Sequence, residues 1–359
     1  MNDDFQILAY VDSFASHQEV RSICIKESIS SIKPLVSIMI PTYRRPELLR
    51  EAVVSALAQT TSIPFEVVVV DNDPDSVMTL KVDNLINSIS ASNLRLFRNE
   101  SNIGMFANWN RCISLARGTW VTILNDDDLL ECNYLAYCLE LLGTRPNIKM
   151  VACGAFIRDE RKVCGDTLSK SRRYGSVVKR IIQMLRPTRL VKLTACDYFL
   201  ENPHCGSLGV LLHKESAIHT GGFNPAAYPS ADFVFFVRLQ SMYSILLTNK
   251  KLATYRINQN ESLRWDVVEK FMSQSIQIRR ELQSKVPIPQ SVCNLYSRWL
   301  SIEIGSHYAE SWGVSVDKLN VHDMNFSPPT SVYWRVRGLK FLIRLWCSLI
   351  SYLPKPYAS

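Results

Sequence analysis

Glycine-rich phosphate-binding turns are missing from this sequence. Only 13 of its 359 residues are glycine, and none of them forms a GxGxxG pattern. A Rossmann dehydrogenase carries that pattern after its first strand, so this class is excluded. A nucleotidyltransferase would ordinarily need a glycine-rich loop in the same place, where this chain has the glycine-free segment PTYRRPE.

Two other absences concern cysteine and long apolar runs. The ten cysteines form neither a CxxC pair nor a Cys/His grouping at zinc-ligand spacing. The opening segment MNDDFQILAY is acidic and lacks a charged region before an apolar core, so we expect no secretory signal there. Both features favour a reducing, cytoplasmic setting with free thiols. No stretch reaches the roughly 18 to 20 uncharged apolar residues of a membrane-spanning helix, so we expect no span.

The excess of positive charge is concentrated in two segments. The formal net charge is +8, and basic residues crowd into Ser169–Lys192 and Tyr333–Trp346. Nucleic-acid binding would predict aromatic and basic residues interleaved on a sheet face, whereas these lie among apolar residues at helical spacing. We therefore expect an anionic membrane surface as a partner, and no nucleic acid.

From Leu35 onward, apolar runs typical of buried strands alternate with helical patterns. This alternation predicts an α/β fold with a mostly parallel central sheet covered by helices on both faces. With 47% apolar and 21% charged residues, the chain has the ordinary composition of a globular protein with one large core or two domains. The predicted helices include 46–59 and 105–116, and the predicted strands are 35–40, 65–72, 94–99, 120–126 and 149–157.

Polar residues stand where the predicted strands end. Pro41 directly follows one strand, the polar residues Asp71, Asn99 and Asp126 lie at the ends of three others, and ligands of such sheets collect at the carboxyl ends. The successive carboxylates 126–128 would repel one another and any anionic ligand unless a cation intervened. Ligands that are all oxygen atoms favour a hard divalent ion, Mg²⁺ or Mn²⁺, which would bridge the acids to a phosphate.

Five segments of the chain stand out in order: VSIMIPTYRRPELLREAVVSALAQ, FEVVVVDNDPDS, RNESNIGMFANWNRCISLARGTWVTILNDDD, GGFNPAAYPSADFVFFVRL and TYRINQNESL. Together they resemble the inverting family-2 glycosyltransferases of the GT-A fold. The first is similar to the family's opening strand, Pro-Thr-Tyr turn and first helix, the second to its second strand, and the third follows the family's spacing up to the acidic metal motif. The fourth is similar to the segment that carries the catalytic base, and the fifth to the closing tyrosine-arginine element. The likeness covers residues 35–264, and many such relatives build bacterial surface polysaccharides.

This resemblance implies a role for each matching side chain. Asp127 takes the position that usually binds the metal, with Asp126 and Asp128 in support, and which of the three touches the ion stays open. Asp232 matches the general base. The residues expected to bind the nucleotide sugar are Pro41, Thr42, Tyr43, Arg44, Asp71, Asp73, Asn102 and Asp126.

Three positions depart from the family pattern. Asn125 stands where many relatives have the first Asp, which leaves the metal-binding acid open. Ala231 replaces a Glu and Asn258 replaces a His, so the contacts to the acceptor stay open. His204 is expected either to line the acceptor site or to be a satisfied structural histidine. Arg256 is expected either to meet the diphosphate or to pair with an acid at the edge of the core.

The expected chemistry is one displacement at the sugar carbon. A cation held by the acids would stabilise the negative charge that gathers on the leaving diphosphate. Asp232 would remove the proton of the acceptor hydroxyl, and such bases typically contribute about 10²–10⁴-fold. Each of these residues also has a purely structural interpretation. An acidic run such as 126–128 is typical of a solvated turn, and Asp71 could simply form a turn. Asp232 could cap the N-terminus of the helix that follows it, a position for which Ser230 is the other candidate. Neither a Ser-His-Asp order nor a Cys-His pairing indicates a covalent nucleophile.

The C-terminal segment 337–351 predicts a helix with a narrow polar face. Most of its surface is apolar, which suits a helix in a bilayer interface with Trp334 and Trp346 at headgroup level. The alternative is a helix packed against the catalytic domain or a second subunit. Segment 177–185, VVKRIIQML, also gathers apolar residues on one side, and the role of residues 165–195 stays open. At ~100° per residue, the polar residues that fall within about 80° of one another are Arg337, Lys340, Arg344, Ser348 and Ser351.

Together these features predict a peripheral glycosyltransferase on the cytoplasmic face of the cell membrane. It would transfer one sugar from a nucleotide diphosphate sugar, with UDP favoured, to a hydroxyl of a lipid-linked or other glycan acceptor. The alternatives are a soluble glycosyltransferase acting on a protein or free glycan, and a catalytically inactive relative that serves as a membrane assembly partner. The expected organisation is an N-terminal extension (1–34), a GT-A domain (35–264) and a helical C-terminal region (265–359) with a membrane-interface segment (331–353).

Overall fold

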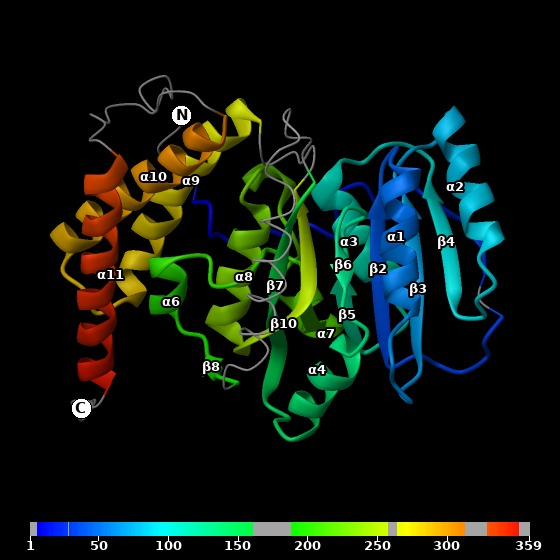
Figure 1. Cartoon of the computed structure of the whole chain (residues 1–359), viewed down its shortest axis with the longest axis horizontal. Coiled ribbons are helices and arrows are strands. Elements are labelled where there is room, and N and C mark those ends of the chain that lie inside the picture. The colour runs from blue at the N-terminus through cyan, green and yellow to red at the C-terminus, as the bar shows by residue number, and fades with distance from the viewer. Residues whose placement is uncertain (1–5, 28, 161–187, 258–263, 313–328, 352–359) are drawn as a thin grey trace, which may run out of the picture.

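One mixed sheet with helices on both of its faces forms the larger part of the molecule, and a group of C-terminal helices stands beyond one end of it (Figure 1). The computed structural model describes residues 6–27, 29–160, 188–257, 264–312 and 329–351. Asn258, the segment 177–185 and most of residues 165–195 lie outside the described residues. Within the described part, ten strands form the sheet in the order β1-β4-β3-β2-β5-β9-β7-β10-β6, and β8 pairs with β10.

Four neighbouring parallel strands carry the edge at which the predicted site lies. Their register aligns Thr42 with Asp71 and Asp71 with Arg98, so the carboxyl ends of three of the strands meet at one level. The predicted strands are confirmed here to within a few residues. The four strands are β2 (Val36–Thr42), β3 (Phe65–Asp71), β4 (Leu94–Asn99) and β5 (Trp120–Ile123).

The rest of the sheet mixes parallel and antiparallel pairs. β9 (Val210–His213) runs antiparallel between β5 and β7 (Ile148–Asp159), and β10 (Ser244–Ile257) is parallel to β7. β6 (Leu129–Leu130) and β8 (Leu190–Lys192) pair antiparallel with β10. β1 (Ser22–Lys26) pairs antiparallel with β4, so a strand lies within the segment that we predicted as an extension.

The strands are buried on both sides because helices cover both faces. Val67 and Val69 belong to the core beneath α1 (Pro46–Leu57), α2 (Val77–Ser88) and α4 (Tyr134–Gly143). Val68 and Val70, which alternate with them, belong to the opposite core under α3 (Met105–Leu115), α7 (Lys214–His219) and α8 (Ala231–Met242). Short 3₁₀ turns occur at Pro225–Ala227 (η1) and Gln283–Lys285 (η3).

Three C-terminal helices stand at the end of the molecule away from α2, with the short α6 (Ala195–Leu200) between them and α8 (Figure 1). They are α9 (Trp265–Leu282), α10 (Gln290–Trp312) and α11 (Pro329–Ser351). Tyr296 and Val336 from these helices share a buried cluster with Phe233 of α8. None of the described helices has the length and apolar character needed to cross a bilayer.

The N-terminal segment is attached to the same helical layer. Ile7 is buried in the core that contains α8 and α9. The backbone N–H groups of Ile7 and Leu8 donate to the Glu281 carboxylate at 2.7 and 2.8 Å. The described part of the predicted extension therefore packs as part of the fold, and the division at residues 34 and 264 stays a proposal.

Candidate active site

A cavity of about 740 Å³ opens at the carboxyl ends of the parallel strands. Asp126, Asp127 and Asp128 form part of its wall on the turn after β5, and Asp232 reaches it from the first turn of α8. We call this space the acidic cavity. It brings together most of the predicted site residues, and the others on its wall include Pro41, Thr42, Tyr43, Asn102 and His204.

The three consecutive acids have different partners. Asp126 Oδ2 accepts from the Thr42 hydroxyl at 2.8 Å. Asp127 Oδ2 lies 3.1 Å from Nη1 of Arg45, and Asp128 Oδ1 accepts from the backbone N–H of Arg256 at 3.1 Å. Burial, with a smaller contribution from the charge of Asp127, raises the pKa of Asp126 to about 6 and that of Asp128 to about 8. Burial and the neighbouring charge both disfavour the ionised acids, so a nearby cation would stabilise their negative charge.

The acids fit a cation that takes one or two ligands from the protein and the others from the substrate and water. Within the described chain, no three His, Cys, Asp or Glu side chains converge so as to hold a metal by themselves. Mg²⁺ is usually held by one or two carboxylates, substrate phosphates and water. The side chain of Asp127 is 14% exposed, and the whole residues Asp126 and Asp128 are 6% and 1% exposed. Asp127 and Asp126 are thus the acids open to such an ion, and their contact with it stays a prediction.

Arg256 holds the turn of residues 126–128, which we call the acidic turn, by hydrogen bonds to its backbone oxygens. It is fully buried, and its Nε donates to the backbone oxygen of Asp127 at 2.5 Å. Its Nη1 pairs with Glu51 on α1 at 3.0 Å. This contact is the ion pair with an acid at the edge of the core that we gave as one alternative. Arg256 does not lie on the described wall of the acidic cavity.

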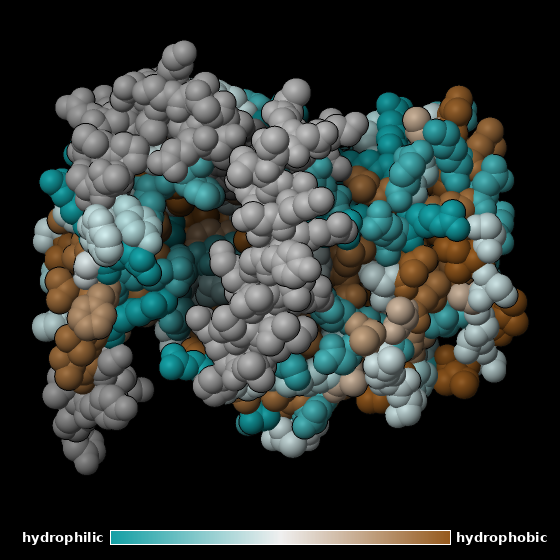
Figure 2. All heavy atoms as spheres, viewed as in Figure 1, coloured by the Kyte–Doolittle hydropathy of each residue, from teal (hydrophilic) through white to brown (hydrophobic). Residues whose placement is uncertain are grey.

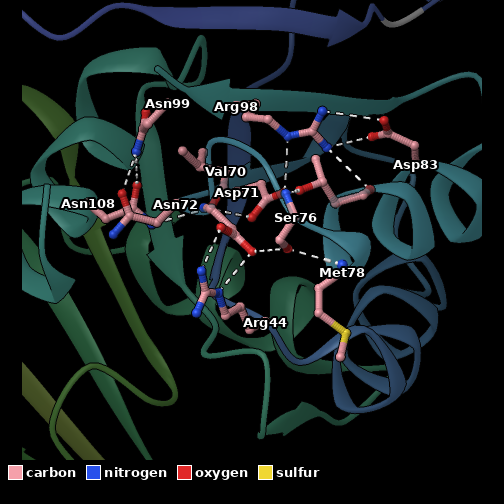
Figure 3. A network of polar contacts seen from close by, with 12 residues as sticks. Arg44, Val70, Asp71, Asn72, Ser76, Met78, Asp83, Arg98, Asn99 and Asn108 are labelled. Carbon is pink, nitrogen blue, oxygen red and sulfur yellow. Dashed lines mark hydrogen bonds and ion pairs between the residues drawn. The ribbon is translucent and has the colours of Figure 1, made fainter. Parts of the chain in front are cut away.

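Asp71 and its neighbours form a polar network beside the cavity (Figure 3). Asp71 is fully buried, and its Oδ2 accepts from Nε of Arg98 at 3.2 Å. Arg44 pairs with Asp73 at 3.1 Å, and the backbone N–H of Asp73 donates to Asp71. Among the described residues, Arg44, Asp71 and Asp73 are absent from the wall of the acidic cavity. Their predicted contacts with a nucleotide stay predictions.

Asn72 takes the place on the wall that we expected for Asp71. Successive side chains at a strand end point to opposite faces, so Asp71 turns to Arg98 while Asn72 turns to Asn99. Asn72 Nδ2 donates to the side-chain oxygen of the predicted Asn102 at 2.8 Å, and Asn72 Oδ1 accepts from Asn99 at 2.9 Å. Asn99 also donates to Asn108 of α3 at 2.8 Å (Figure 3). This amide network fixes the rim of the cavity between β3, β4 and α3.

Asp232 is poised to accept a proton. Its Oδ1 accepts from the backbone N–H of Phe233 at 2.7 Å, whereas the rival cap Ser230 makes no side-chain cap bond. Burial raises the pKa of Asp232 to about 6, and the hydrogen bond from Phe233 only partly opposes that rise. A carboxylate with such a pKa is ionised at pH 7 but is more basic than an exposed Asp, which suits general-base work.

His204 has the hydrogen bonds of the satisfied structural histidine that we gave as one alternative, and its contact with an acceptor stays a prediction. A carbonyl oxygen only accepts, so Nδ1 of His204 donates to Gly206 O at 2.9 Å, and Nε2 accepts from the Tyr198 hydroxyl at 3.1 Å. Burial lowers the pKa of His204 to about 4, so the ring is neutral at pH 7. The ring is therefore a satisfied structural histidine that also lines the acidic cavity.

Several residues of the wall were missed by sequence analysis. Arg45 lies on the wall of the acidic cavity, whereas the predicted Arg44 does not. The backbone of Arg44 has a φ of +59°, so the chain turns at this residue and the two arginine side chains point in different directions. The position of Arg45 directly before the helix-starting Pro46 is the only signal in the sequence. The other missed residues include Asn72, Asn108, Trp109, Tyr255 and Phe271, and of these Tyr255 belongs to the closing tyrosine-arginine element noted above.

Known proteins share this fold and sequence pattern. Residues 37–191 match the Glycosyl transferase family 2 domain. An uncharacterized glycosyltransferase of Methanocaldococcus jannaschii, MJ1057, is 33% identical over 234 residues, which are 64% of this chain and 73% of that one. The hyaluronan synthase of Pasteurella multocida is 34% identical over 117 residues, 32% of this chain and 12% of the synthase.

A solved structure shows the same architecture over nearly the whole chain. The mannosyltransferase PcManGT from Pyrobaculum calidifontis, solved with GDP-Man and Mn²⁺, superposes with a TM-score of 0.52 at 16% identity, and the match covers 92% of this chain and 88% of that one. At this identity the likeness concerns the fold, and it confirms the predicted GT-A architecture. The chain belongs to glycosyl transferase family 2 and is a glycosyltransferase of the GT-A fold.

Proposed function

We propose that this glycosyltransferase is metal-dependent and inverting, and that it transfers a sugar from a nucleotide diphosphate sugar to a hydroxyl of a glycan acceptor. One observation carries the proposal: the acids that would hold a cation and the carboxylate that would act as base share a single cavity. PcManGT, which has the same fold, was solved with a nucleotide sugar and Mn²⁺. That likeness supports the class of donor and cofactor, while the resemblance noted above favours UDP over GDP as the nucleotide of the donor.

The residues divide the reaction between them. Asp127, with Asp126, would hold Mg²⁺ or Mn²⁺, and the bound ion would offset the charge of the diphosphate as it leaves. Asp232 takes the proton from the acceptor hydroxyl while the oxygen of that hydroxyl forms a bond to the anomeric carbon. The bond from that carbon to the diphosphate breaks in the same step, so the configuration inverts. Arg256 and Thr42 hold the acidic turn in place during this charge movement.

Calorimetry with UDP or GDP in the presence of Mn²⁺ tests the donor site directly. The unmodified protein should bind at least one of the two nucleotides, and EDTA should weaken that binding by about tenfold or more. Asp127→Ala should produce the same loss, whereas Glu140→Ala, an exposed carboxylate on α4, should not. Binding that is indifferent both to EDTA and to Asp127→Ala would overturn the metal proposal.

We further propose that the acceptor is presented at a membrane surface, because α11 turns its apolar side away from the protein. Val336 and Ile343 are buried against the fold, and Lys340 and Arg344 pair with Glu201. The residues that we call the α11 stripe are Trp334, Phe341, Leu342, Leu345 and Leu349, which are between 48% and 70% exposed.

The space-filling view shows hydrophobic side chains at this end of the molecule (Figure 2). Arg335 and Arg337 are also exposed on α11, so cations accompany the stripe. An apolar helix face next to cations is typical of a helix lying in an anionic bilayer interface. This supports a lipid-linked glycan as the acceptor and a place on the cytoplasmic face of the membrane, as in surface-polysaccharide synthesis.

A further inference from the structure

A second cavity of about 740 Å³ meets the acidic cavity at the catalytic carboxylate. The two cavities have Asn202, Asp232 and Phe271 in common. The second one lies among the C-terminal helices, with Ser275 and Arg279 from α9, Ser306 from α10 and Tyr333 from α11 on its wall. We call it the helical cavity. Asp232 is thus reachable from two separate spaces.

We infer that the helical cavity binds the sugar of the acceptor and places its reactive hydroxyl against Asp232. The inference rests on the proposed function, in which the acidic cavity is filled by the donor. A base that serves an inverting transfer must contact the acceptor while the donor is bound. Since Asp232 lines both cavities, it meets this requirement with each substrate in its own space.

The wall of the helical cavity has the chemistry that a pyranose ring requires. Ser306 is 5% exposed, and its hydroxyl has no hydrogen-bond partner among the described residues, which is costly unless a ligand supplies one. Arg279 is 2% exposed and is fixed by hydrogen bonds to Phe199 O at 2.7 Å and to the Ser275 hydroxyl. These groups suit the hydroxyls of a sugar, and Phe271 offers an aromatic ring to its C–H face.

The position of the helical cavity also suits an acceptor held by a lipid. Tyr333 of α11 lines the cavity, and the next residue, Trp334, belongs to the α11 stripe. A sugar in the cavity would therefore lie close to the surface that we propose to face the bilayer. The same helix would then contact both the saccharide and the membrane that carries its lipid.

The test measures transfer of labelled sugar from UDP- or GDP-sugars into a lipid extract from the cells that make this protein. Ser306→Phe fills the helical cavity and should raise the KM for the extract by about tenfold or more. Ser306→Ala removes one hydrogen bond and should raise that KM by about three- to tenfold. Asn294→Phe, the same kind of change on the exposed side of α10, should leave the KM unchanged. In every variant the Kd for the nucleotide with Mn²⁺ should stay within about twofold.

The outcomes separate this inference from the proposed function. If Ser306→Phe binds nucleotide normally and transfers sugar with an unchanged KM, the acceptor assignment is overturned while the donor site stands. If Ser306→Phe also loses nucleotide binding through misfolding, Ser306→Ala decides, and an unchanged KM there overturns the assignment. If the unmodified protein transfers no sugar from any donor, the proposed function fails and the acceptor assignment falls with it.

Discussion

A Cβ atom on Gly206 would lie 2.7 Å from Oδ2 of Asp232. The backbone of Gly206 also has a φ of +55°, which residues with side chains rarely adopt. The Gly206 carbonyl in turn accepts from His204, whose other ring nitrogen is held by Tyr198. A buried chain of hydrogen bonds therefore ends at a glycine that touches the proposed base and limits where its carboxylate can lie.

Replacing Gly206 should impair catalysis more than substrate binding. In Gly206→Ala the new methyl group would push the Asp232 carboxylate from its position, and small displacements of a catalytic group are costly. We expect kcat to fall by about 10- to 100-fold, while the Kd for the nucleotide stays within about threefold. Gly143→Ala is the matched control, because a Cβ at Gly143 meets no atom within 4 Å. Equal kcat values for the two variants would show that Gly206 does not position the base.

The charge state of Asp232 should set the acidic limb of the pH profile. With its pKa raised by burial to about 6, the carboxylate becomes protonated as the pH falls through that value, and kcat should fall with it. Asp232→Asn should lower kcat by about 10²–10⁴-fold and remove this limb. Initial rates between pH 5 and 9 measure both effects. An unchanged profile in the variant would assign the titration to another group.

The same carboxylate should make the protein less stable at alkaline pH. Its folded pKa of about 6 lies above the ordinary value of 3.8, so the folded state binds the proton more tightly than the unfolded state. The resulting stability is fully present below about pH 4 and is lost as the pH rises through 6, by up to ~3 kcal/mol. Asp232→Asn should therefore raise the Tm at pH 8 relative to the unmodified protein. A lower Tm for this variant at pH 8 would contradict the claim that the ionised, buried Asp232 destabilises the folded protein.

Adjacent arginines should differ in their importance for the donor. Arg45 lies on the wall of the acidic cavity, 3.1 Å from Asp127, where it neutralises part of the acidic charge. Arg44 pairs with Asp73 beside the cavity. We expect Arg45→Ala to raise the KM for the nucleotide sugar by about tenfold and Arg44→Ala to raise it by less than threefold. The opposite order would restore the nucleotide contact that the sequence pattern predicts for Arg44.

The comparison of sequence with structure shows which features a pattern can specify. Strand ends are visible because buried, mostly apolar runs stop at polar residues, as at Asp71 and before Asp126, and parallel strands bring those ends together. The direction of a side chain is harder to predict, because neighbouring residues at a strand end point to different sides. The sequence pattern pointed to Asp71 and Arg44, whereas the residues on the wall of the acidic cavity are their neighbours Asn72 and Arg45. The contacts of β1 and of the C-terminal helices depend on residues far apart in the chain, so no local pattern predicts them.

The α11 stripe should anchor the protein to anionic vesicles. Phe341→Ser combined with Leu345→Ser removes two exposed apolar side chains, and each contributes about 1.5–3 kcal/mol when it is fully buried. The partition coefficient onto phosphatidylcholine vesicles with about 30% phosphatidylglycerol should therefore fall at least tenfold in a sedimentation assay. Leu80→Ser on α2 removes an exposed leucine at the other end of the molecule and should have no effect (Figure 1).

The same variants distinguish a bilayer from a second copy of the chain as the partner of α11. A lipid interface predicts that binding weakens as salt rises, because Arg335 and Arg337 contribute attraction to the anionic headgroups. It also predicts a monomer in analytical ultracentrifugation without vesicles. Three observations together would instead identify α11 as a subunit interface: the unmodified protein is a dimer, the double variant is a monomer, and neither of them binds vesicles. In that case its apolar stripe would be buried by protein, and the membrane-held acceptor would lose its structural support.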